Sequence, residues 1–150
     1  MKKPVFTKLL QICMVVDDLE AYIKRYEEDY GIGPWTVIEC NKDNISDMTV
    51  MGKKLDFAMR VAVCDFANTQ FELLQPTDDN NLFMDFLKKH GPGLHHVAFD
   101  TQGYDQTIEG LAARGYEVIQ SGVDGTGLTF SYVDLNKDLG MVVELYKQPE

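Results

Sequence analysis

The hydrophobic positions along the chain predict the same order of elements twice. In the first half, the apolar run at 9–16 ends at Asp17-Asp18, which is typical of a buried strand followed by a helix cap. Apolar residues with helical spacing then continue as far as Gly31, at Leu19, Tyr22, Ile23, Tyr26 and Tyr30. Three extended runs follow, at 36–40, 58–64 and 70–74, with a polar loop between the first two. The first half therefore predicts β-α-β-β-β.

The second half repeats this order. A strand-like run at 94–100 precedes a helical pattern that ends at Gly115, and extended runs follow at 116–120, 128–133 and 141–146. FELLQP at 71–76 resembles VELYKQP at 143–149, since each has a glutamate inside an apolar strand and a proline shortly after it. We therefore expect one domain over residues 1–150, with module one at about 8–76, module two at about 93–147, and a linker at 77–92. The sequence NLFMDFLKK within the linker predicts a short helix that starts near Asn80 or Asn81.

Four polar residues interrupt the apolar strands that begin and end the two modules: Gln11, Glu72, His96 and Glu144. A carboxylate buried in a strand requires a cation or several hydrogen-bond donors, because burying it alone costs several kcal/mol. Strand alternation gives each of the four a face that could line one cavity. One imidazole, two carboxylates and one amide predict a divalent metal site suited to zinc, nickel, cobalt or manganese. Alternation puts His95 on the opposite face, in a structural or ligand-supporting role.

The expected fold class is α+β, with two βαβββ modules forming one curled mixed eight-stranded sheet around a metal-containing cavity. Charge argues against a nucleic-acid partner, since 14 Lys and Arg against 24 Asp and Glu give −10. The three cysteines, Cys13, Cys40 and Cys64, form no CxxC pattern, and we expect them to be buried, reduced thiols. No run is long enough to span a membrane and no signal peptide is recognised, which predicts a cytoplasmic protein. His90 is expected in a solvated loop, and Trp35 either packs in its loop or stacks on a ligand.

These features resemble the vicinal oxygen chelate superfamily, which includes glyoxalase I, methylmalonyl-CoA epimerase, extradiol dioxygenases and bleomycin-resistance proteins. The resemblance covers about residues 8–147 and is carried by QICMVVDDLE, GLHHVAFD, ELLQP and VVEL. It implies one metal ligand from the first and last strand of each module. Those positions here are Gln11, Glu72, His96 and Glu144. This set is similar to that of glutamine-containing glyoxalase I, whereas the epimerases usually have a histidine at the first position.

The resemblance implies a metal-dependent isomerase or lyase of the glyoxalase I (lactoylglutathione lyase) type. Such an enzyme chelates a small substrate with two neighbouring oxygens, and Glu144 or Glu72 would transfer the proton through an enediolate. Glutathione would be a co-substrate, and the chain would form a homodimer. The alternatives are an epimerase of the methylmalonyl-CoA type and a metal-free binding protein of the bleomycin-resistance type. Extradiol dioxygenase activity is disfavoured, because its ferrous site needs two histidines and one carboxylate.

Overall fold

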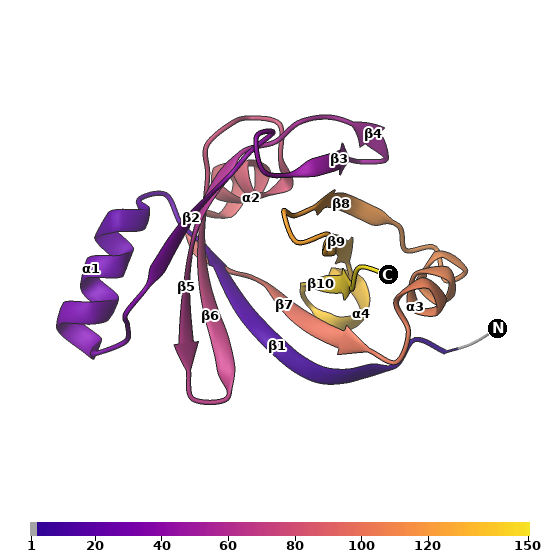
Figure 1. The fold of residues 1–150 in the computed structure, drawn as a ribbon, viewed down its shortest axis with the longest axis horizontal. Coiled ribbons are helices and arrows are strands. Elements are labelled where there is room, and N and C mark those ends of the chain that lie inside the picture. The colour runs from indigo at the N-terminus through magenta and orange to yellow at the C-terminus, as the bar shows by residue number, and fades with distance from the viewer. Residues whose placement is uncertain (1–2) are drawn as a thin grey trace.

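Ten strands form one strongly curved mixed sheet, and four helices pack around it (Figure 1). This computed structural model describes residues 3–150. The strands are β1 (Phe6–Val15), β2 (Thr36–Cys40), β3 (Ser46–Val50), β4 (Lys53–Lys54), β5 (Met59–Phe66), β6 (Thr69–Pro76), β7 (Gly93–Thr101), β8 (Val118–Val123), β9 (Thr129–Asp134) and β10 (Val142–Lys147). The helices are α1 (Leu19–Tyr30), α2 (Leu82–His90), α3 (Tyr104–Ala112) and α4 (Asn136–Leu139).

The strand order is β2-β5-β6-β1-β7-β10-β9-β8-β3-β4. Each half of the chain supplies a β-α-β-β-β unit, made of β1, α1, β2, β5 and β6 in the first half and β7, α3, β8, β9 and β10 in the second. In both units the first strand pairs parallel with the last, β1 with β6 and β7 with β10. The units join through the antiparallel pair β1–β7. The first and last strands of both units are therefore four consecutive strands at the centre of the sheet.

The predicted α+β class and curled mixed sheet are confirmed, but the expected count of eight strands is wrong. The two additional strands, β3 and β4, form a hairpin in the segment 41–57 that the sequence analysis treated as a polar loop. β3 pairs with β8 of the second half, and the segment buries Ile45, Met48 and Phe57 in the core. Its apolar residues are isolated among polar ones, so no continuous run predicted a strand there. Pairing with β8 and burial of these three side chains in the core stabilise the hairpin.

Side-chain caps mark the start of α1 and α2 where the sequence predicted these two helices. Asp18 caps α1 by accepting a 3.1 Å hydrogen bond from the backbone N of Ala21, and α1 ends at Gly31, whose φ of 66° is left-handed. The linker helix α2 starts directly after Asn81, whose Oδ1 accepts a 2.8 Å bond from the Met84 backbone N. The short helix α4 was not predicted. No helix of residues 3–150 is long and apolar enough to cross a membrane.

The concave side of the sheet is filled by a large apolar cluster. It combines residues of five strands with α2 and the segment 41–57: Cys13, Val15, Ile45, Met48, Phe57, Met59, Val61, Leu74, Phe83, Phe130, Tyr132 and Val142. Gly122 of β8 is part of this packing, because a Cβ there would lie 2.7 Å from both Ile45 Cγ2 and Phe130 Cζ. On the other side, α1 packs on β5 and β6, and α3 packs on β10 (Figure 1). A polar side chain in the middle of this cluster is therefore surrounded by apolar atoms.

Candidate metal site at the centre of the sheet

The four polar residues singled out in the sequence lie on the four central strands. Gln11 is on β1, Glu72 on β6, His96 on β7 and Glu144 on β10. All four are buried, with exposed fractions between 2% for His96 and 9% for Glu72. Neighbouring strands lie about 4.8 Å apart, so residues on one face of adjacent strands are within side-chain contact of each other.

The side chains of the four residues meet around the His96 imidazole. His96 Nε2 lies 3.1 Å from Glu144 Oε2 and 3.8 Å from Glu72 Oε1. Gln11 Nε2 lies 3.4 Å from Glu72 Oε2. The structure thus brings together the four residues that the sequence analysis selected, although they are up to 133 positions apart in the chain (144 minus 11). Their assignment as metal ligands stays a prediction.

Two buried atoms of this cluster have no hydrogen-bond partner among the described residues. They are His96 Nε2 and Glu144 Oε2, which lie 3.1 Å apart but do not hydrogen-bond to each other. Leaving a buried polar atom unpaired costs about 1–3 kcal/mol, so such atoms are rare in folded proteins. An imidazole nitrogen and a carboxylate oxygen that converge on one point are ligands for a divalent cation. The donor set therefore fits a metal ion.

The electrostatics of the site also favour a cation. Burial raises the pKa of Glu72 to about 7, and the negative charge of Glu144 acts in the same direction. His96 and hydrogen bonds from Cys13 and Gln11 only partly oppose this effect. Two buried carboxylates without a cation repel each other, whereas a divalent ion between them would stabilise both as anions.

Gln11 makes hydrogen bonds at both ends of its amide. Its Nε2 donates a 2.7 Å bond to Gln70 Oε1 in addition to the contact with Glu72, and its Oε1 accepts a 3.4 Å bond from the Tyr146 hydroxyl. The amide nitrogen, rather than the oxygen, thus faces Glu72. In this arrangement Gln11 links the carboxylate on β6 to Tyr146 on β10.

Cys13 is the residue at the site that the sequence analysis did not select. It is fully buried, as expected for a packing residue, but its Sγ, a Glu72 carboxylate oxygen and a His96 ring nitrogen all lie within 4.8 Å of one another. Burial raises the pKa of its thiol, and the Glu72 carboxylate raises it further. The signal in the sequence was its position two residues after Gln11, which places both side chains on one face of the strand.

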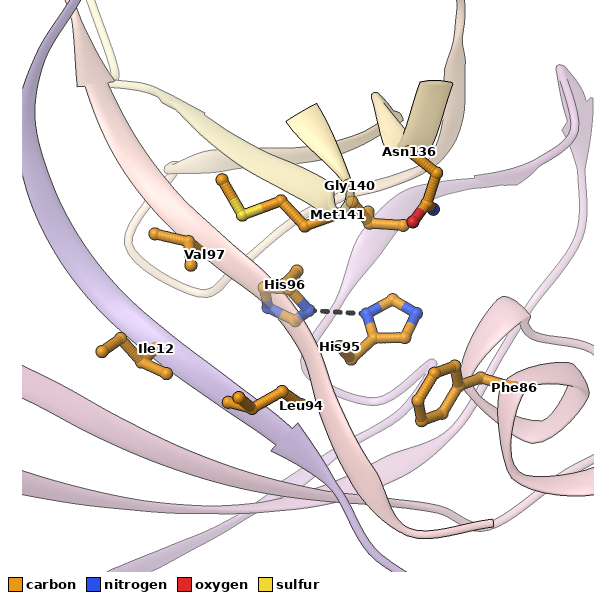
Figure 2. Close-up of a pocket in the computed structure, with 10 residues that line it drawn as sticks. Ile12, Phe86, Leu94, His95, His96, Val97, Asn136, Gly140 and Met141 are labelled. Carbon is orange, nitrogen blue, oxygen red and sulfur yellow. Dashed lines mark hydrogen bonds between the residues drawn. The ribbon is translucent and has the colours of Figure 1, made fainter. Parts of the chain in front are cut away.

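His95 supports the ring of His96. Its Nδ1 lies 2.9 Å from His96 Nδ1 (Figure 2), so one of the two nitrogens donates to the other. Strict alternation would separate the two rings, but both contact Phe83 of α2 at centroid distances of 5.1 and 5.9 Å. The pairing of β7 with β1 is irregular at this point, between Cys13 and Met14. Burial lowers the pKa of His95 to about 3, so it is neutral at physiological pH.

A cavity of about 410 Å³ lies next to the histidine pair. Its walls include Phe86 of α2, Leu94 of β7 and Met141, which precedes β10 (Figure 2).

Trp35 does not line this cavity. Its indole Nε1 donates a 2.9 Å bond to the Ile32 carbonyl, and its ring packs on Tyr26. Of the two roles expected for Trp35, packing within its own loop is the one observed.

Comparison with known proteins identifies the family. Residues 10–132 match the model of the Glyoxalase/Bleomycin resistance protein/Dioxygenase superfamily. No curated protein sequence matches the chain. Similar solved structures include methylmalonyl-CoA epimerase from Mycobacterium tuberculosis, with a TM-score of 0.66 and 19% identity over 100% of this chain and 93% of that one.

Two further structures show the same fold. A variant of Streptomyces coelicolor methylmalonyl-CoA epimerase in complex with 2-nitronate-propionyl-CoA has a TM-score of 0.68 and 20% identity, over 97% of this chain and 99% of that one. A hypothetical protein from Bacillus halodurans has a TM-score of 0.66 and 18% identity, with 95% of each chain covered. The match to the family model extends over most of the chain, and so the chain belongs to the glyoxalase/bleomycin resistance protein/dioxygenase superfamily, the vicinal oxygen chelate superfamily.

Proposed function

We propose that the protein is a metal-dependent isomerase of the glyoxalase I type, acting on a small substrate with two neighbouring oxygens. The observation that carries this proposal is the convergence of His96 Nε2 and Glu144 Oε2, both buried and unpaired, beside the carboxylate of Glu72. A metal-free binding protein would gain nothing from two buried carboxylates and an unpaired imidazole nitrogen. The same cluster therefore argues against the bleomycin-resistance alternative.

Glu72, His96 and Glu144 would hold the metal, together with one side chain from β1, for which the sequence predicts Gln11. When bound, a divalent ion polarises two neighbouring substrate oxygens as a Lewis acid. His95 would fix the orientation of His96 through the 2.9 Å contact between their Nδ1 atoms. The apolar residues of the concave face would exclude water from the reacting carbon.

Glu144 is our candidate for the side chain that removes and returns the proton. Its Oε2 makes no hydrogen bond among the described residues, whereas Glu72 Oε2 is contacted by Gln11. Glu72 is the second candidate for this role. Among the described residues, these two are the only buried acidic side chains.

This lack of a third buried acid favours the glyoxalase type over an epimerase with a separate, non-ligand base. The resemblance to the epimerases implies this base near residues 48–60, where the chain offers only Asp47 and Asp56, and both are exposed. An epimerase acting on an acyl-CoA thioester is the second candidate function, because the folds of methylmalonyl-CoA epimerases cover nearly the whole chain. For a glyoxalase I-type enzyme, the substrate would be the hemithioacetal of glutathione, and glutathione would be the co-substrate.

The test is metal analysis followed by proton exchange. The purified protein is stripped of metal, reloaded with zinc, nickel, cobalt or manganese, and incubated in deuterium oxide with a glutathione hemithioacetal or with an acyl-CoA. We expect stoichiometric metal, and deuterium incorporation that is abolished in Glu144→Gln. The exposed Glu117→Gln is the matched control and should retain exchange. Exchange into the acyl-CoA alone would select the epimerase, and a protein whose metal content is unaffected by His96→Ala would contradict the proposal.

A further inference from the structure

Cys13 lies in the same row of the sheet as two of the candidate ligands. Its Cα pairs with Glu72 on β6 and with His96 on β7, so the three residues are direct cross-strand neighbours. Gln11 lies in the next row, where its partners are Gln70 and Ala98. β1 therefore offers two side chains to the site, and the thiol is the one between the carboxylate and the imidazole.

The positions of the atoms agree with this row. Cys13 Sγ, a Glu72 oxygen and a His96 nitrogen lie within 4.8 Å of one another. A tetrahedral zinc ion, with bonds of about 2.3 Å to sulfur and about 2.1 Å to nitrogen or oxygen, keeps its ligand atoms about 3.5 Å apart. The three atoms are therefore at most about 1.3 Å farther apart than in a zinc-bound set. The unpaired atoms of His96 and Glu144 are the independent sign that a ligand belongs here.

The amide of Gln11 is already occupied by other partners. It donates to Gln70 and accepts from Tyr146, and it presents nitrogen, a donor, toward the Glu72 carboxylate. An amide in this orientation stabilises the carboxylate but offers no lone pair in its direction.

We propose that Cys13 is a metal ligand, so that the ion is held by Cys13, Glu72, His96 and Glu144, with Gln11 as a positioning residue for Glu72. The inference rests on the proposed function, because it assumes that the site binds a metal. On binding, the thiol proton is released to solvent and the sulfur coordinates as a thiolate. A sulfur ligand favours zinc or cobalt over manganese, which narrows the range of metals given by the sequence.

Spectroscopy of the metal-loaded protein tests the proposal. The cobalt(II) form should show a near-ultraviolet sulfur-to-cobalt charge-transfer band, and X-ray absorption of the zinc form should show one sulfur at about 2.3 Å. Cys13→Ser should lose the band, and its zinc affinity should fall by about tenfold or more, with a reduced preference for zinc over manganese. Cys64→Ser is the matched control, because Cys64 is a buried cysteine of β5 away from the site. Ala62, on the same face of β5, belongs to a different apolar cluster from Cys13. Both Cys64→Ser and Gln11→Ala should keep the band.

A second variant keeps the test decisive if Cys13→Ser does not fold. In Cys40→Ser/Cys64→Ser, Cys13 is the only remaining cysteine of the chain, and X-ray absorption should still show the sulfur. Stoichiometric zinc with only nitrogen and oxygen neighbours would overturn this inference and leave the proposed function intact. A wild-type protein that binds no metal would overturn both.

Discussion

Replacing Glu72 by glutamine should stabilise the metal-free protein, even though it removes a proposed ligand. Burial and the charge of Glu144 raise the pKa of Glu72 from 4.5 to about 7. At 1.36 kcal/mol per pH unit, keeping this carboxylate ionised in the folded state costs about 3 kcal/mol. Glutamine has nearly the same shape and no charge, so the variant avoids this cost.

The sign of the effect fixes its pH dependence. Because the pKa is higher in the folded than in the unfolded protein, Glu72 stabilises the fold fully below about pH 4.5, and this contribution is lost as the pH rises through about 7. The difference in unfolding free energy between Glu72→Gln and wild type should therefore be near zero at about pH 4 and approach about 3 kcal/mol at about pH 8. Urea unfolding in the presence of EDTA at both pH values measures it.

Added zinc should reverse the order of stability. Wild type gains about 4.1 kcal/mol when free zinc exceeds its dissociation constant a thousandfold, which is more than its deficit of about 3 kcal/mol at about pH 8, and the variant gains much less. The exposed Glu117→Gln should behave like wild type in every condition. An equal difference in unfolding free energy between Glu72→Gln and wild type at about pH 4 and about pH 8, both in EDTA, would refute the claim that ionising the buried Glu72 destabilises the fold.

Three further outcomes test the surroundings of the site. His95→Leu removes the hydrogen-bond partner of His96 Nδ1, and zinc affinity measured by calorimetric titration should weaken by about 10–100-fold. An unchanged affinity would show that His95 does not support the ligand. Gly122→Ala inserts a Cβ into the packed contact with the segment 41–57 and should lower the unfolding free energy by about 1–3 kcal/mol, whereas Gly125→Ala, where nothing lies within 4 Å, should not. Asn81→Ala removes the cap of α2 and should cost about 1–2 kcal/mol in denaturant unfolding; an equally stable variant would show that the cap is dispensable.

The sequence by itself determined the order of the elements and the strands that carry the chemistry. Hydrophobic periodicity depends on local geometry, so the repeated β-α-β-β-β pattern, the start of α1 after Asp18 and its end at Gly31 could be predicted. Glu72 and Glu144 stood out because an acid inside an apolar strand is costly without a partner. The hairpin β3–β4 could not be predicted, because it depends on pairing with a strand that is distant in the sequence. Val50 of β3, for example, pairs with Gln120 of β8.

Only the tertiary structure decided which side chains are neighbours within the site. Alternation assigns Gln11 and Cys13 to one face of β1, but the pairing of β1 with β6 and β7 places the thiol in the row of His96. In the sequence a cysteine in an apolar strand reads as a packing residue. The contact between His95 and His96 depends on a local irregularity in the strand pairing that no periodic pattern encodes. Register and irregularity arise from contacts between distant segments, and this is why the face of each strand was predictable while the partners across the sheet were not.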